Sequence, residues 1–192
     1  MLIIISMLLS TNNIYSNNSK QLDIGVKFMA GGRYDDLRMC VGSDAGVKGG
    51  PVADIMLLIK KEWQNDKNLA LEVPVMRPLL FGATFDMLQF EPQLSLEFTG
   101  KMNNNRSYIF APGLGISLHY GPDYKSDLDN RGDEFFAAGP MVSGLIGIHK
   151  TSQNNKSRIY GLRLFYIHLF SSETELSPGN VMGVVFETQF EL

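Results

Sequence analysis

The chain is poor in the residue types that build metal clusters, disulfides and nucleic-acid surfaces. Its 192 residues include one cysteine and three histidines. One cysteine excludes an internal disulfide and any zinc cluster built on several cysteines. With 17 basic against 20 acidic residues, the chain lacks the basic excess of a nucleic-acid-binding protein. It also lacks the common motifs for nucleotides and catalytic metals, so we expect no cofactor and no metal.

The chain has no apolar run long enough to cross a bilayer as a helix. Residues 2–9 are apolar apart from Ser6, and polar residues follow through Ser16. This pattern is typical of the hydrophobic part of a secretion signal, although no basic residue precedes it. We expect a signal peptide over 1–16 and a single domain over 17–192. The alternative for residues 2–9 is a buried first strand.

Bulky apolar residues that alternate with polar or small residues are abundant. Such period-2 alternation predicts β-strands whose two faces meet different surroundings. Helical periodicity is weak, and residues 79–88 are the best helix candidate. The alternation therefore predicts an all-β domain of about eight strands. We expect these strands over residues 22–28, 52–63, 69–77, 90–98, 108–120, 135–149, 158–170 and 181–192.

The composition of the less apolar face separates two kinds of barrel. From Ala111 to His119 this face carries only alanine, glycine, serine and histidine. A face in water would carry more lysine and glutamate, whereas small residues fit the crowded interior of a narrow barrel whose apolar face meets lipid. Tyr108 and Tyr120, at the two ends of this segment, suit the aromatic girdles of a membrane barrel. We therefore predict that the apolar face points away from the barrel axis.

The spacers between the predicted strands alternate between longer and shorter, as in barrels with short periplasmic turns and longer outer loops. Phe186, Phe190 and Leu192 are similar to the C-terminal signal of such barrels, with leucine in place of the usual final phenylalanine. On these features, residues 22–192 resemble small eight-stranded outer-membrane β-barrel proteins of Gram-negative-type bacteria.

The resemblance implies a closed, antiparallel, up-and-down β-barrel in the bacterial outer membrane. It further implies contact with membrane lipid and a lipopolysaccharide-type outer leaflet, and recognition of the C-terminal strand by the barrel-assembly machinery. It implies no particular activity, because unrelated functions share such folds.

Charged residues on the predicted inner face form the first candidate site. Closing the barrel places the first and last strands side by side, which brings Lys27 near Glu187 or Glu191. Because buried charges must be paired or hydrated, we interpret these residues as a polar network that sets strand register, with more acid than base. The predicted inner-face residues are Asp23, Lys27, Glu72, Glu91, Glu97, His119, Glu187 and Glu191.

An acidic cluster in the fifth spacer is the second candidate. It consists of Asp123, Asp127, Asp129, Asp133 and Glu134. The alternating carboxylates resemble the start of a calcium loop, but arginine and alanine occupy positions that need ligand oxygens. A solvated outer loop explains the cluster. Arg131-Gly132-Asp133 is a tripeptide that some host integrins recognise, and it leaves the identity of any host or surface ligand open.

The leading interpretation is an outer-membrane protein with a surface structural or interaction role and no identified catalysis. One alternative is a soluble secreted or periplasmic barrel that, like a lipocalin, holds an apolar ligand. The other is an outer-membrane lipid-modifying enzyme. That enzyme would use His168 to activate Ser171 or Ser172, with Glu173 or Glu175 orienting the imidazole.

Overall fold

The structure is a computed structural model. It describes residues 22–36, 48–64, 66–83, 87–103, 105–124, 131–151, 157–172 and 179–191. The predicted signal peptide over 1–16 lies outside the described residues, as do Cys40 and Leu192. The described elements in chain order are β1 (Leu22–Asp35), β2 (Gly50–Gln64), β3 (Lys67–Pro74), α2 (Met76–Gly82), β4 (Leu88–Phe90), β5 (Gln93–Asn103), β6 (Arg106–Tyr124), β7 (Arg131–Thr151), β8 (Ser157–Ser171) and β9 (Gly179–Glu191).

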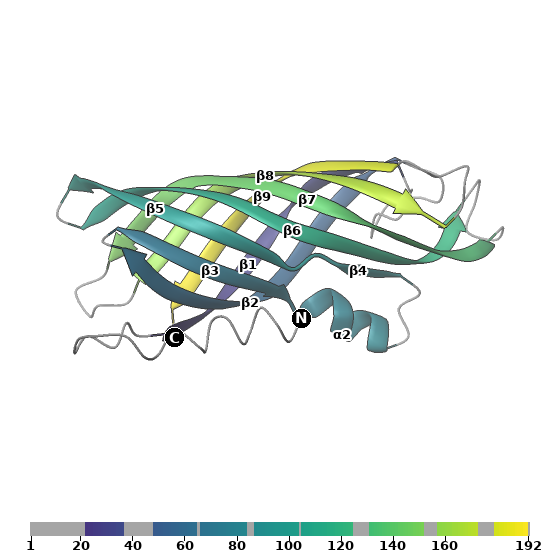
Figure 1. Ribbon diagram of the computed structural model, residues 1–192, viewed down its shortest axis with the longest axis horizontal. Coiled ribbons are helices and arrows are strands. Elements are labelled where there is room, and N and C mark those ends of the chain that lie inside the picture. The colour runs from purple at the N-terminus through teal and green to yellow at the C-terminus, as the bar shows by residue number, and fades with distance from the viewer. Residues whose placement is uncertain are drawn as a thin grey trace.

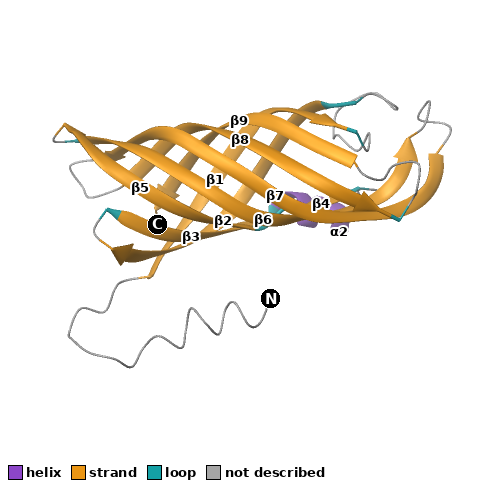
Figure 2. Cartoon of the chain, turned by 45° about the horizontal axis from the view of Figure 1, so that its top comes forward, coloured by secondary structure: helices purple, strands orange, loops and turns teal. Residues whose placement is uncertain are grey.

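Eight of these strands close a ring. Antiparallel pairing runs through β1, β2, β3, β5, β6, β7, β8 and β9, and β9 pairs back to β1. Figure 1 shows the strands running at a slant along the long axis, and Figure 2 shows them wrapping around the interior. The predicted closed up-and-down barrel is confirmed. Closure pairs the edges that an open sheet would leave exposed.

The two ends of the barrel differ in the length of their connections. At one end, residues 65–66, 104–105 and 152–156 join neighbouring strands. At the other, the connections are residues 36–49, 75–92, 125–130 and 172–178. We call these the short-turn end and the long-loop end. β1 begins and β9 finishes at the short-turn end (Figure 1), as the predicted alternation of spacer lengths requires.

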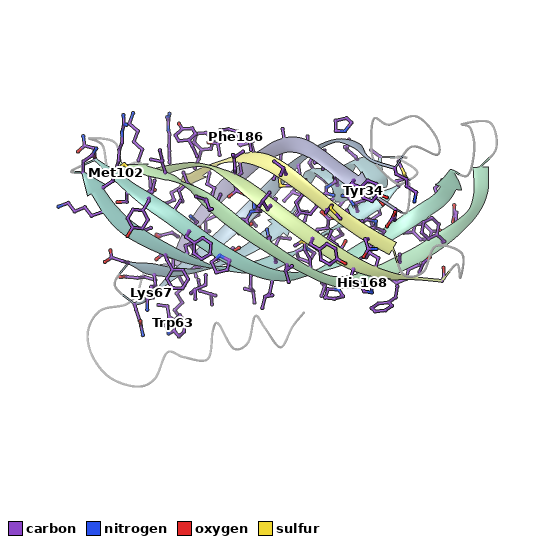
Figure 3. All side chains as sticks on the ribbon, turned by 90° about the horizontal axis from the view of Figure 1, so that it is seen from above. Tyr34, Trp63, Lys67, Met102, His168 and Phe186 are labelled. Carbon is purple, nitrogen blue, oxygen red and sulfur yellow. The ribbon has the colours of Figure 1, made fainter. Side chains whose placement is uncertain are left out.

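Apolar side chains cover the outside of the barrel. Leu114 is 69% exposed and Phe186 is 51% exposed, while Ser117, on the opposite face of the same strand as Leu114, is fully buried. Figure 3 shows Phe186 pointing away from the barrel. Tyr108, Phe110 and Ile116 are exposed with Leu114, so the predicted outward direction of this face is confirmed.

The interior is partly apolar. One apolar cluster fills the long-loop half of the barrel and includes Phe135, Phe165 and Ile167. A smaller one at the short-turn half contains Ile109, Ala111, Leu145 and Ile159. β7 and β8 are therefore apolar on both faces over much of their length. This explains why their period-2 pattern is weaker in the sequence than that of β6.

The predicted helix over 79–88 is wrong in its bounds. β3 ends at Pro74, and α2 occupies only Met76–Gly82. Leu88–Phe90 is a short strand instead, because Leu88 pairs with Tyr120 of β6. Tertiary pairing thus outweighs the local preference of an apolar run that could form either helix or strand. No helix among the described residues is long and apolar enough to cross a membrane.

A matched pair of glycines in β1 tests the close approach of β1 to β9. A Cβ atom at Gly31 would lie 2.1 Å from the backbone oxygen of Val184, whereas at Gly32 the nearest atom, Gly50 O, is 3.9 Å away. We expect Gly31→Ala to lower the free energy of unfolding by about 1–3 kcal/mol, because the backbone of β9 must shift. Gly32→Ala should change it by less than about 0.5 kcal/mol. Urea titration of both variants measures this, and equal midpoints would contradict the packing.

Candidate functional site

Charged side chains gather inside the barrel. Among the described residues, five basic and six acidic side chains are buried. The predicted excess of acid over base on the inner face is therefore only one charge among these residues, because the prediction counted a single cation. The inner charges group into three clusters along the barrel axis. From the short-turn end we call them the lower, central and upper clusters.

The lower cluster is built around Lys60 of β2. Its ammonium nitrogen lies 2.9 Å from Glu97 Oε1 and 3.8 Å from Glu191 Oε1. It also donates a 2.8 Å hydrogen bond to Gln189 Oε1. These partners come from β5 and β9, neither of which neighbours β2 in the ring. One ammonium group therefore ties three separate parts of the wall together.

The central cluster holds four alternating charges. Lys27 forms ion pairs with Glu72 and, at 3.5 Å, with Glu187. Arg163 reaches the same two carboxylates, with 2.7 Å from its Nε to Glu187 and 3.1 Å from its Nη2 to Glu72. These residues belong to β1, β3, β8 and β9, so they link both sides of the position where the ring closes. The predicted proximity of Lys27 to Glu187 matches this geometry.

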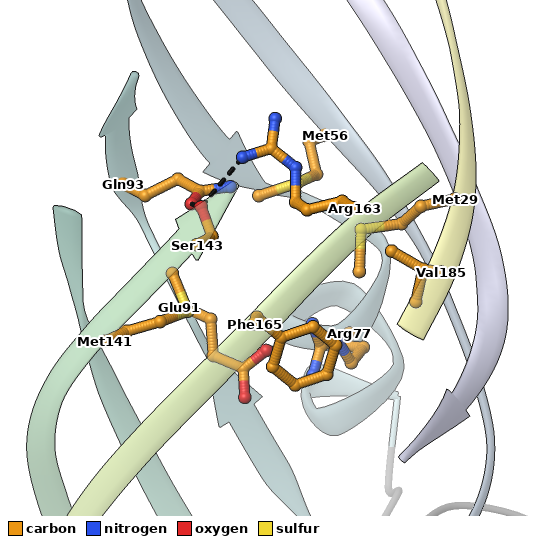
Figure 4. A pocket seen from close by; sticks show the side chains of 10 residues that line it. All are labelled: Met29, Met56, Arg77, Glu91, Gln93, Met141, Ser143, Arg163, Phe165 and Val185. Atoms are coloured by element: carbon orange, nitrogen blue, oxygen red, sulfur yellow. Dashed lines mark hydrogen bonds and ion pairs between the residues drawn. The ribbon is translucent and has the colours of Figure 1, made fainter. Parts of the chain in front are cut away.

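Neutral polar groups complete the hydrogen bonding of the central cluster. Glu72 accepts hydrogen bonds from Ser95 and, at 2.8 Å, from Gln93 Nε2. Ser143 donates to Gln93 Oε1 at 2.7 Å and accepts from Arg163 Nη1 at 2.9 Å (Figure 4). Each buried charge thus meets several partners, as burial of ions requires.

The upper cluster centres on Glu91, between β4 and β5. Its carboxylate lies 3.2 Å from Arg33 Nη1, 2.8 Å from Arg77 Nη2 and 3.3 Å from His119 Nε2. Asp35 supplies a further carboxylate, 3.1 Å from Arg33 Nη2. The predicted inner-face residues Glu91 and His119 are both buried here, together with two arginines.

Arg77 joins the upper cluster across a break in the wall. β3 pairs with β2 only as far as Met56, so the part of β2 nearer the long-loop end lacks β3 as a neighbour. The backbone N–H of Ile55 donates instead to Asp54 Oδ1 at 2.8 Å. Arg77 Nε donates to Asp54 Oδ2 at 2.7 Å, and its Nη2 reaches Glu91. α2 covers this break from outside (Figure 2), and Arg77 bridges its two sides from within.

Side chains fill the space between the clusters. A cavity of about 20 Å³ lies between the central and upper clusters, with room for about one water molecule. Arg163 and Ser143 line it from one side, and Arg77 and Glu91 from the other (Figure 4). It is far smaller than the several hundred Å³ of a typical small-molecule site.

Asp36 connects β1 to β9 at the long-loop end. It accepts hydrogen bonds from Tyr34 at 2.7 Å and Lys48 at 3.1 Å, and its backbone N–H donates to Asn180 O at 3.0 Å. Partial burial raises the pKa of Asp36, but the hydrogen bonds that its carboxylate accepts from Tyr34, Lys48 and the backbone N–H of Asn180 outweigh it, so the pKa lies below its ordinary value. This contact stabilises the fold above the unfolded-state pKa, and its contribution is lost as the pH falls through the lower folded-state pKa.

The remaining predicted residues fall in different places. Asp23 pairs with Lys60 and so shares the inner-facing side of β1, but it is exposed because it lies beyond Gly25, where the described pairing of β1 with β9 ends. In the acidic cluster, Asp127 and Asp129 and the side chains of Asp123 and Asp133 lie outside the described residues. Glu134 is exposed and accepts a hydrogen bond from Tyr120.

Of the groups proposed for a lipid-modifying enzyme, the structure describes His168, Ser171 and Ser172. His168 Nδ1 lies 3.2 Å from Asn180 Oδ1, and its ring packs edge-on against Phe170. Ser172 Oγ accepts a hydrogen bond from the backbone N–H of Phe136. Glu173 and Glu175 lie outside the described residues. In the described part of the chain, no group of three or more His, Cys, Asp or Glu residues could hold a metal ion.

Four of the five buried cations were missed at the sequence level. They are Arg33, Lys60, Arg77 and Arg163. Lys60 lies two residues from the apolar inner residue Leu58, and Arg163 lies two residues from Phe165. The inner face of these strands therefore looked apolar in the sequence. A lone charge in an otherwise apolar strand was the available signal. The sequence gives no such signal for Arg77, because Arg77 reaches the interior from a helix.

Comparison with known proteins supports the fold assignment. No protein-family model and no curated protein matches this sequence. Among solved structures, Neisserial surface protein A (NspA) superposes with a TM-score of 0.53 at 11% identity, over 88% of this chain and 97% of NspA. Ail, the attachment invasion locus protein of Yersinia pestis, superposes with a TM-score of 0.40 at 12% identity, over 89% of this chain and 97% of Ail.

The fold is therefore that of small eight-stranded outer-membrane β-barrel proteins. This assignment rests on the strand pairing and on NspA, because the superposition with Ail is too loose to establish a common fold. At 11% identity, the likeness to NspA concerns the fold alone.

A double-mutant cycle on Lys60 and Glu97 tests the lower cluster. Either single change, Lys60→Met or Glu97→Leu, leaves a buried charge without its main partner and should cost about 3–5 kcal/mol of unfolding free energy. The double variant removes both charges and should cost much less than the sum of the single effects. Urea unfolding in detergent micelles measures all three. Additive single effects would contradict the pairing.

Proposed function

We propose that this chain is an outer-membrane β-barrel protein of a Gram-negative-type bacterium with a surface structural or interaction role. The observation that carries the proposal is the reversed distribution of polarity. Eleven charged side chains of the described residues are buried inside the barrel, while Leu114 and Ile146 on its outside are each 69% exposed. In a soluble barrel the apolar face would point inward, whereas lipid stabilises an apolar outer face.

The connections indicate the orientation in the membrane. Outer-membrane barrels have short turns on the periplasmic side and longer loops outside. The short-turn end would therefore face the periplasm, and the long-loop end would face the cell exterior and a lipopolysaccharide-type outer leaflet. A secretion signal over 1–16 fits this route.

The C-terminal strand supports the proposed recognition by the barrel-assembly machinery. Phe186 is exposed on the outer face of β9, and the ring of Phe190 packs edge-on against Phe28 of β1 with ring centres 6.0 Å apart. The same strand supplies Glu187 to the central cluster. The segment proposed as an assembly signal therefore also closes the barrel.

The filled interior favours a scaffold over a channel or a lipocalin-like container. Three ion-pair clusters and two apolar clusters occupy the space between the strands. The cavity between the central and upper clusters holds about one water. An interaction role would then depend on the long-loop end, since binding residues are often on loops held by a rigid scaffold.

Arginine substitution of an outward residue tests the membrane location. Leu114→Arg should lower the free energy of unfolding in lipid vesicles by about 2–4 kcal/mol, because a charge near the bilayer midplane is costly. Asn105→Arg is the matched control: it adds the same side chain at an exposed position of the turn between β5 and β6 and should be nearly neutral. Wild type should also migrate differently on gels with and without heating. A neutral Leu114→Arg would contradict the proposal, because a water-facing site tolerates arginine.

Cysteine labelling of intact cells tests the orientation. In a Cys40→Ser background, Lys48→Cys places a thiol at the long-loop end and Asn105→Cys places one at the short-turn end. A membrane-impermeant maleimide should label the first on intact cells and the second only after the outer membrane is opened. The reverse pattern would show that the orientation is inverted.

A further inference from the structure

Three basic side chains stand side by side on the outer face near the short-turn end. Arg106 of β6 pairs in register with Lys150 of β7, and Lys150 pairs with Arg158 of β8. All three are exposed. We call them the basic row. Directly opposed like charges on neighbouring strands repel each other, so the row is unfavourable unless an anion neutralises it.

The protein supplies no such anion among the described residues. Arg106 and Lys150 form no ion pair there, and Arg158 instead places its guanidinium over the ring of Phe190, 5.5 Å from its centre. The adjoining connections contain no acid in their sequences, which are Asn-Asn-Asn at 103–105 and Ser-Gln-Asn-Asn-Lys at 152–156. The described part of the chain therefore leaves the basic row without a neutralising anion.

The level of the basic row on the barrel indicates the source of that anion. Two residues further into the barrel on the same strands, Tyr108, Ile148 and Tyr160 form the next outward row. The row beyond it, Phe110, Ile146 and Leu162, is apolar. Apolar, aromatic and basic rows thus follow one another in steps of about 6.6 Å along the strands. This is the order in which a bilayer passes from hydrocarbon through the interface to phosphate.

We propose that the basic row binds the phosphate groups of anionic phospholipids in the periplasmic leaflet. The inference rests on the proposed membrane location and orientation. Arginine suits this ligand because its guanidinium donates two parallel hydrogen bonds to phosphate oxygens. Because the row occupies only β6, β7 and β8, bound lipid would hold one side of the barrel at a fixed depth.

The opposite side of the same end has a different arrangement. Lys67 donates a 3.1 Å hydrogen bond to Gln64 Oε1 and lies over the ring of Phe98. Glu62 and Asp66 lie close to it in the sequence. The cations there are interspersed with acids, and we assign no lipid site to that side.

The test compares the full chain with the triple variant Arg106→Gln/Lys150→Gln/Arg158→Gln. Both are refolded into phosphatidylcholine vesicles with and without phosphatidylglycerol as a minor component. For wild type, phosphatidylglycerol should raise the urea midpoint, and added salt should weaken the effect. The triple variant should lose this response. Retention of phosphatidylglycerol in native mass spectrometry should fall roughly 100-fold, which corresponds to about 3 kcal/mol for three basic residues.

A second triple variant controls for net charge. Lys48→Gln/Lys67→Gln/Lys101→Gln removes the same charge from scattered exposed positions and should keep the response to phosphatidylglycerol. In pure phosphatidylcholine, the basic-row variant should be at least as stable as wild type, because like-charge repulsion is relieved. Equal responses from wild type and both variants would overturn the inference. So would a full effect of inorganic phosphate in phosphatidylcholine vesicles, because the site would then bind free anions.

The experiment also separates this inference from the proposed function. If wild type folds in phosphatidylcholine as a heat-modifiable barrel but ignores phosphatidylglycerol, the lipid site is wrong and the membrane barrel stands. If wild type folds without detergent or lipid, both proposals fail.

Discussion

Each charge inside this barrel must find a partner across the interior, because an unpaired buried charge costs several kcal/mol. The central cluster joins the two sides of the ring closure: Lys27–Glu72 and Arg163–Glu187 each lie on one side, and the contacts of Lys27 with Glu187 and of Arg163 with Glu72 cross it. Moving β1 by one residue against β9 would turn Lys27 toward the outside of the barrel and Phe28 inward. Charge pairing inside and apolar contact outside therefore select the same register.

The need to pair polar groups that water does not reach also explains how the barrel wall tolerates the break beside β2. The end of β3 at Pro74 leaves part of β2 without that neighbour, and an unpaired backbone edge facing lipid is costly. Asp54 satisfies the backbone N–H of Ile55, and Arg77 then pairs with Asp54 and Glu91 while α2 covers the outside. A helix of seven residues is stable here because its arginine is anchored in the upper cluster rather than by its own hydrogen bonds.

A barrel filled in this way is a rigid support, and its two ends differ in the charged groups that they carry. The long-loop end carries the acidic cluster of the fifth spacer, whereas the short-turn end carries the basic row in register across three strands. An interaction role at one end and a lipid contact at the other are compatible, because neither uses the interior.

The sequence alone determined the class of fold, because alternation in β1, β5, β6 and β9 and the rhythm of spacer lengths follow directly from strand geometry and barrel connectivity. It also placed Lys27, Glu72, Glu91, Glu97, His119 and Glu187 on the inner face, where the structure has them. Only the tertiary structure decided which charges meet. The partners Lys60, Arg77 and Arg163 lie on other elements than Glu97, Glu91 and Glu187, and the tertiary packing of those elements brings the charges together. Asp23 shares the inner-facing side with Lys60 but is exposed, because the described pairing of β1 with β9 ends at Gly25.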